Sequence, residues 1–275
     1  VAIGNRAGQT TQSTNSVAIG NQAGGTTQGE NAVAMGLQAG ETSQGANSIA
    51  IGTQTGQTGP QGSSCVAIGN LAGNGTQGNN AVALGSQAGS GTQGFSGVAI
   101  GILAGNDTQG NFAVAIGNTA GQTSQGFHTV AIGNQAGKTS QGRDSIAIGR
   151  LAGNDTQLLD AVAIGVEAGQ IDQANNGVAI GNRSGETTQG GSGVAIGNRA
   201  GQTTQSTNSV AIGNQAGGTT QGENAVAMGL QAGETSQGAN SIAIGTQTGQ
   251  TGPQGSSCVA IGNLAGNGTQ GNNAV

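Results

Sequence analysis

The tetrapeptide Val-Ala-Ile-Gly occupies residues 1–4 and returns along the whole chain, with only Ile, Met or Leu in its third place. Its copies start sixteen residues apart, except at two steps of seventeen residues, which contain Gly59-Pro60 and Gly252-Pro253. A fixed period of this size is typical of a repeat protein, in which each repeat is one structural unit that stacks on its neighbours. We number the places of a repeat from the Val of this tetrapeptide.

The array also contains a longer repeat. Residues 194–275 copy residues 1–82 letter for letter, at an offset of 193 residues. We therefore expect residues 1–275 to form one continuous array of 17 repeats, with a 193-residue super-repeat. We also expect the chain to be a segment of a longer protein.

The composition limits how such repeats can fold. The 275 residues include 58 Gly and three Phe but no Trp or Tyr, so large side chains cannot fill the core of a globule of this size. The charged fraction is 6% and the net charge is −5, which excludes an electrostatic surface for nucleic acid or anionic lipid. No window approaches the roughly 18 apolar residues of a membrane span, so we predict no membrane insertion in this segment.

The conserved tetrapeptide predicts a strand followed by a bend. Val17, Ala18 and Ile19 alternate large and small side chains with a period of two, which favours a strand over a helix. Gly20 and Gly24, at places four and eight, can supply the bends that close a coil. The predicted fold class is all-β, a parallel β-solenoid or β-roll with one sixteen-residue repeat per turn.

Stacked coils would place each residue above its copy in the next repeat. Gln28, at place twelve, would then belong to a column of Gln whose amides can hydrogen-bond to the turns above and below. A row of Gln that reads carbohydrate is the alternative interpretation.

The strand could face either way. If Val and Ile point inward, the outer face is flat Ala and Gly; if they point outward, an aliphatic stripe follows the stack and must be covered. In both cases a cyclic homo-oligomer could cover the apolar face, since the same stripe recurs on every copy.

The segments Asn15-Ser16-Val17-Ala18-Ile19-Gly20 and Asn47-Ser48-Ile49-Ala50-Ile51-Gly52 resemble the signature of trimeric autotransporter adhesin heads (YadA-like). Similar repeats occur in phage and giant-virus fibres. The resemblance implies a left-handed parallel β-roll that forms trimers, with Val17 and Ile19 near the trimer axis. The sequence departs from the family repeat by its additional Thr-Thr-Gln-Gly segment.

Catalytic chemistry has no candidate residues. The only histidine, His128, lies at a variable place beside Phe127, and acidic residues such as Asp107 and Asp155 fall at irregular places. No nucleophile, base and stabiliser come together, so we predict no enzyme activity and no catalytic, cofactor-binding or metal-binding residues.

Two cysteines and five sequons leave alternatives open. Cys65 and Cys258 hold the same place of the super-repeat, twelve turns apart, so they cannot pair with each other. They are either buried free thiols or cross-links between chains. The Asn-x-Ser/Thr sequons could carry glycans only in a secretory setting; they begin at Asn74, Asn106, Asn154, Asn182 and Asn267.

The three phenylalanines gather in successive repeats. Phe95, Phe112 and Phe127 lie at places fourteen or fifteen, which makes them a candidate contact patch. Drift in a tolerant loop is the alternative explanation.

These features together predict a structural protein. We expect a long, stiff extracellular or virion-surface fibre, acting as an adhesin shaft or attachment fibre at the cell or virion surface. Its partners would be copies of itself, as a trimer or filament, together with a surface receptor or glycan. Ice binding and glycan binding are the alternative functions; the irregular place ten, with Gly75, Asp107 and Ile171, disfavours a regular ice-binding array.

Overall fold

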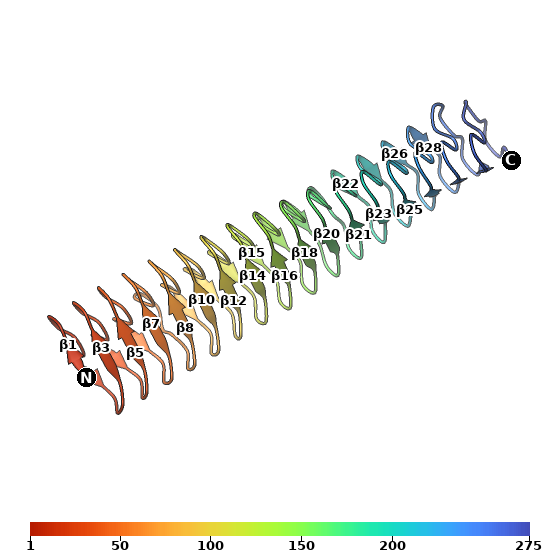
Figure 1. Ribbon diagram of the computed structural model, residues 1–275. Coiled ribbons are helices and arrows are strands. Elements are labelled where there is room, and N and C mark those ends of the chain that lie inside the picture. The colour runs from red at the N-terminus through yellow and green to blue at the C-terminus, as the bar shows by residue number, and fades with distance from the viewer. The chain divides into compact units, whose positions relative to one another are not determined.

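The chain is all-β, as a computed structural model of residues 1–275 shows (Figure 1). It forms two compact units, Val1–Thr139 and Ser140–Val275. In each unit, coils of about sixteen residues stack on one another, and each coil carries a long strand at Val-Ala-Ile and a short strand at Thr-Gln. The predicted parallel β-solenoid is confirmed, whereas its left-handedness stays a prediction.

The first unit contains one sheet of long strands and two groups of short strands. The long strands are β1 (Ala2–Ile3), β3 (Val17–Ile19), β5 (Val33–Met35), β7 (Ile49–Ile51), β8 (Val66–Ile68), β10 (Val82–Leu84), β12 (Val98–Ile100), β14 (Val114–Ile116) and β16 (Val130–Ile132). The short strands are β2 (Thr11–Gln12), β4 (Thr27–Gln28), β6 (Ser43–Gln44), β9 (Thr76–Gln77), β11 (Thr92–Gln93), β13 (Thr108–Gln109) and β15 (Ser124–Gln125).

The second unit repeats this arrangement. Its long strands are β18 (Ile146–Ile148), β20 (Val162–Ile164), β21 (Val178–Ile180), β23 (Val194–Ile196), β25 (Val210–Ile212), β27 (Val226–Met228), β29 (Ile242–Ile244) and β30 (Val259–Ile261). Its short strands are β17 (Ser140–Gln141), β19 (Thr156–Gln157), β22 (Thr188–Gln189), β24 (Thr204–Gln205), β26 (Thr220–Gln221) and β28 (Ser236–Gln237).

Neighbouring coils pair in parallel and in register, so each place forms a column along the stack. In the first unit, Val17 pairs with Val33 and Ala18 with Ala34. The Gly20 N–H donates to the Ile3 carbonyl at 2.8 Å, in the slanted pattern of a parallel ladder. The backbone thereby satisfies its polar groups between coils.

The interior of a coil is built from small residues and one amide. Ala18, Ala23 and Gln28 are all completely buried. Place sixteen, which closes the coil, is filled by Ser, Ala, Gly, Thr or Cys, and Ser16 is one of its buried members. Ala18 therefore points inward, and Val17 and Ile19, on the opposite side of the same strand, point outward. This settles the direction that the sequence left open.

Left-handed backbone closes both ends of the coil. Gly20 has a φ of 131°, and a Cβ there would collide with the carbonyl group of Gly36 in the next coil. Gln22 and Asn31 take φ values of 58° and 56° in the two turns. Such conformations are uncommon outside Gly, so the turn geometry is a strict requirement of the coil.

The seventeen-residue repeats absorb their extra residue without losing register. The pairing of Ile49 with Val66 keeps the long strands aligned across the step. Around Gly59-Pro60 the short strand is reduced to a single bridge between Gln61 and Gln77. The insertion thus bulges out of the Thr-Gln side alone.

Candidate assembly interface and surface patches

The outward side chains of the long strands make one aliphatic face in each unit. In the first unit it consists of Val1, Ile3, Val17, Ile19, Val33, Met35, Ile49, Ile51, Val66, Ile68, Val82, Leu84, Val98, Ile100, Val114, Ile116, Val130 and Ile132. In the second unit it consists of Ile146, Ile148, Val162, Ile164, Val178, Ile180, Val194, Ile196, Val210, Ile212, Val226, Met228, Ile242, Ile244, Val259 and Ile261.

The aliphatic face is only partly shielded from solvent. Place one is half-buried by its neighbours above and below, while place three reaches 38% exposure at Met35 and 40% at Ile68. Leu37 and Ile102, at place five, extend the apolar surface beside the strands with exposures of 45% and 54%. A contiguous exposed apolar surface of this kind marks an interaction site.

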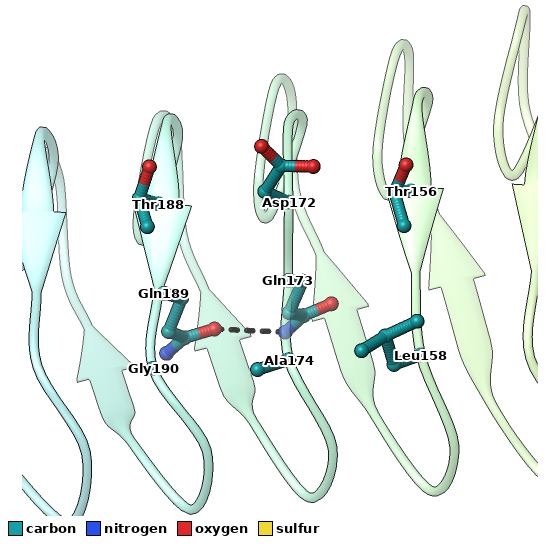
Figure 2. Close-up of a pocket in the computed structure, with 8 residues that line it drawn as sticks. All are labelled: Thr156, Leu158, Asp172, Gln173, Ala174, Thr188, Gln189 and Gly190. Carbon is teal, nitrogen blue, oxygen red and sulfur yellow. Dashed lines mark hydrogen bonds between the residues drawn. The ribbon is translucent and has the colours of Figure 1, made fainter.

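The Gln column ties each coil together from inside. Nε2 of Gln28 donates to the carbonyl of Val17 at 2.7 Å and to that of Ala32 at 3.3 Å, both in its own coil. In the second unit, Nε2 of Gln173 donates in addition to Oε1 of Gln189 at 2.9 Å (Figure 2). Because these amides are buried and their Nε2 groups are engaged, they are not available to read a carbohydrate.

A surface depression lies where the short strand is interrupted in the second unit (Figure 2). Asp172 replaces the usual Thr or Ser and takes a left-handed φ of 48°. The coil there keeps only bridges at Gln173, and a cavity of about 250 Å³ opens beside it. Its floor is apolar, at Leu158 and Ala174, while the Asp172 carboxylate points outward at the rim. The depression therefore directs no polar group at a bound ligand.

Aromatic rings form a short stack on the turn between the Gln strand and the next Val strand. The ring centroids of Phe95 and Phe112 are 5.5 Å apart in an edge-to-face arrangement, and those of Phe112 and His128 are 5.3 Å apart. Phe127 is 51% exposed on the same turn as His128. The sequence grouped the three Phe residues, but the ring that continues the stack from Phe112 is His128, which the sequence pattern marked only as a variable residue. The sequence signal for this contact was that His128 and Phe112 both lie at place fifteen of successive repeats.

An ion-pair ladder connects three coils of the second unit. Glu167 accepts from Arg150 Nη2 at 2.6 Å and from Arg183 Nε at 2.7 Å. These hydrogen bonds, with Arg183 the stronger influence, lower the pKa of Glu167 below its ordinary value. This ladder was not predicted from the sequence, although the separations of sixteen and seventeen residues placed the three side chains in adjacent coils.

The two cysteines are buried free thiols in the structure. Cys65 Sγ donates to the Gly78 carbonyl at 3.0 Å, and Cys258 Sγ makes the equivalent contact with Gly271 at 2.9 Å. Burial raises the pKa of Cys65, which keeps it in the unreactive thiol form. The geometry favours the first of the two alternatives, a small side chain that fills place sixteen.

The structure also bears on metal and membrane sites. It groups no three His, Cys, Asp or Glu side chains in an arrangement that could hold a metal ion. None of its segments is a helix with the length and hydropathy needed to cross a bilayer. The absence of a catalytic, cofactor or metal site stays a prediction.

Four segments match a family model of two copies of the YadA head domain repeat. They are residues 12–39, 28–55, 205–232 and 221–248. The chain contains YadA-like head repeats. Each matched YadA-like segment carries two copies of the long strand, including β3 and β5 in residues 12–39, with their outward Val and Ile or Met. These repeats indicate an adhesin-like structural domain, and no curated protein matches the chain.

Proposed function

We propose that this chain is part of a surface adhesin fibre, in which copies of the β-solenoid associate through their aliphatic faces. The single observation behind the proposal is that Val17, Ile19 and their equivalents point out of every coil instead of into it. A lone solenoid would leave this face in water. The fibre would be extracellular, at the cell surface or on a virion, and would work as an adhesin shaft or attachment fibre.

The energy available from covering the face is large enough to hold copies together. Completing the burial of a half-buried Val or Ile is worth about 1 kcal/mol, hence roughly 2 kcal/mol per coil and chain. Association costs about 4–15 kcal/mol in lost freedom of motion. Fewer than ten coils in contact would therefore stabilise the assembly, and each unit contains about that number.

A closed trimer suits the geometry of the face. The stripe is only one three-residue long strand wide, and it presents aliphatic side chains in register in successive coils. Cyclic symmetry about an axis parallel to the stack covers identical stripes without leaving an open surface. The YadA-like repeats support self-association of this kind.

Mass per unit length, measured by scanning transmission electron microscopy, tests the proposal. From a mass of 26.0 kDa for 275 residues, one chain contributes about 0.32 kDa per Å at a strand spacing of about 4.8 Å. We expect about three times this value. A mass per unit length equal to that of a single chain in the wild-type protein would refute the assembly.

Substitutions on the two outward surfaces make the test specific. Ile180→Asp together with Ile212→Asp places charge on the aliphatic face and should give the single-chain value. Thr188→Asp with Thr204→Asp, on the short strands of neighbouring coils, adds the same charge elsewhere and should keep the trimer value. Equal behaviour of the two double variants would show that the aliphatic face is not the interface.

Ice binding ranks below this proposal. The outward Thr188, Thr204 and Thr220 are in register along the short strands. They form only one rank, however, and Pro60 and Asp172 interrupt the corresponding column in the two units. Thermal hysteresis in dilute solution would be needed to restore this alternative.

A further inference from the structure

All the aromatic side chains of the protein lie on three successive turns of the first unit. The 275 residues include three Phe, one His, and no Trp or Tyr. Phe95, Phe112, Phe127 and His128 all fall on the turns that join a Gln strand to the next Val strand, between β11 and β16. The three Phe are between 39% and 51% exposed, so their rings face solvent instead of filling a core.

The fold itself does not favour these residues. Place fifteen requires a left-handed backbone, and Phe112 and His128 have φ values of 57° and 56°. In every other repeat this place is Asn, Ser or Asp, types whose short polar side chains suit turns. A Phe ring with positive φ is an outlier that costs about 1–3 kcal/mol, and such strain concentrates at functional sites, whereas His is one of the types enriched at positive φ.

The three turns that carry the rings are polar, and the equivalent turn of the next repeat carries an ion pair, Arg143 with Asp144 at 2.8 Å. The turns 94–97, 110–113 and 126–129 contain no acidic or basic side chain except His128. Oδ1 of Asn111 accepts the Phe95 N–H at 2.9 Å, which fixes the amide beside the backbone of Phe95 with its Nδ2 as the remaining donor. The patch thus combines exposed ring surface with amide and imidazole groups.

This combination matches the chemistry of an uncharged sugar. A pyranose has apolar C–H faces that can pack on aromatic rings, and hydroxyl groups at its edge that pair with amides. A charged glycan or an acidic peptide would find no Asp, Glu, Lys or Arg side chain on turns 94–97, 110–113 and 126–129. The rings rise one per coil along the stack, at centroid separations of 5.5 and 5.3 Å, so consecutive sugars of one chain could occupy consecutive rings.

We propose that Phe95, Phe112 and His128 form the platform of a binding site for a neutral oligosaccharide, with Asn111 pairing with its hydroxyl groups. The proposal deepens the adhesin function proposed above and rests on it, since it names the kind of receptor that the fibre would meet. Phe127, exposed beside His128, would extend the platform.

Binding to immobilised oligosaccharides tests the platform. The probes are uncharged oligomers of glucose, galactose and N-acetylglucosamine, with sialylated and sulfated oligomers for comparison. Phe95→Asn and Phe112→Asn restore residue types that the same places carry in other repeats, so the coil should fold normally. Leu159→Asn is the control, because Leu159 is an equally exposed apolar residue at the place of Phe95.

We expect the wild type and Leu159→Asn to bind a neutral oligomer equally. Phe95→Asn and Phe112→Asn should each bind about three- to tenfold more weakly, as loss of an aromatic contact predicts. Failure to bind any neutral oligomer at millimolar sugar, unchanged binding by both Phe variants, or preference for the charged oligomers would each overturn the site.

Mass per length of the same samples separates this site from the fibre proposal. A mass per unit length of three chains without sugar binding would refute only the glycan site. A mass per unit length of one chain in the wild type would refute the fibre. If the two Phe variants changed the mass per length, the rings would be a contact between copies, and the glycan site would be wrong.

Discussion

Replacing the buried Gln173 by Ala should open its coil locally. Nε2 of Gln173 donates to the carbonyls of Val162 and Gly177 at 2.8 and 3.1 Å. It also donates to Oε1 of Gln189 in the next coil at 2.9 Å. Its own Oε1 accepts from Nε2 of Gln157 in the preceding coil at 3.0 Å. The variant removes all four hydrogen bonds and leaves a gap among the small side chains and Gln amides of the core.

The magnitude follows from these contacts. The Gly177 carbonyl still accepts the Val162 N–H, so loss of a Gln173 bond to a carbonyl costs about 0.5–1.5 kcal/mol. Oε1 of Gln189 is left buried without its donor, which costs about 1–3 kcal/mol. The gap adds to this, as in other substitutions of a large buried side chain by Ala. We expect a total of about 3–5 kcal/mol.

Amide hydrogen exchange is the suitable assay, since a stack of repeats can open locally without unfolding as a whole. Protection of the peptides that contain Val162 and Gln173 should fall by about 100-fold or more, at 1.4 kcal/mol per factor of ten. Gln173→Met keeps the volume of the side chain but not its hydrogen-bond donors, so its amide protection should fall less than that of Gln173→Ala. Gln170→Ala, a partly exposed Gln of the same coil, is the control.

Equal protection in Gln173→Ala and Gln170→Ala would refute the reasoning, because it would mean that the amide contributes nothing to closing the coil. Equal loss in Gln173→Ala and Gln173→Met would assign the whole effect to hydrogen bonds and none to the gap.

Three further predictions concern other parts of the coils. Gly20→Ala should destabilise its coil by about 3 kcal/mol or more, because the new Cβ meets the Gly36 carbonyl at an unfavourable φ; unchanged exchange there would contradict this. Arg183 and Arg150 lower the pKa of Glu167, so its ionised form stabilises the coil fully at a pH above the ordinary Glu pKa of about 4.3. This stabilisation is lost as the pH falls from that value through the lowered pKa of the folded protein. Local protection should therefore fall on acidification in the wild type, and Glu167→Gln should remove this part of the pH dependence. Iodoacetamide at pH 8 should label Cys65 only after denaturation, because the thiol is buried and its pKa is raised; rapid labelling of the native protein would show otherwise.

The sequence by itself determined the architecture. The sixteen-residue period, the alternation at Val17, Ala18 and Ile19, and the Gly at places four and eight predicted the strand, the bends and the in-register stack. These features are local, or they repeat at a fixed interval, so the neighbours of each residue can be counted along the chain. The same counting grouped Phe95 with Phe112.

Only the tertiary structure decided which side of the strand is inside. An alternating pattern places Ala18 opposite Val17 and Ile19 but does not say which side faces the coil. The opposite wall decides this, because Ala23 and Gln28 already occupy the interior and leave room only for a methyl group. The one sequence clue was that place two is always Ala, while place three varies among Ile, Met and Leu.

The side-chain contacts within the turns and in the ion-pair ladder were also determined only by the tertiary structure. The left-handed backbone at place fifteen brings His128 next to Phe112, and it cannot be read from the spacing of the Phe residues alone. The Glu167 ladder needed the side-chain directions in adjacent coils. Periodicity specifies which coils are neighbours, whereas the dihedral angles of the turns and the width of the interior determine which side chains meet.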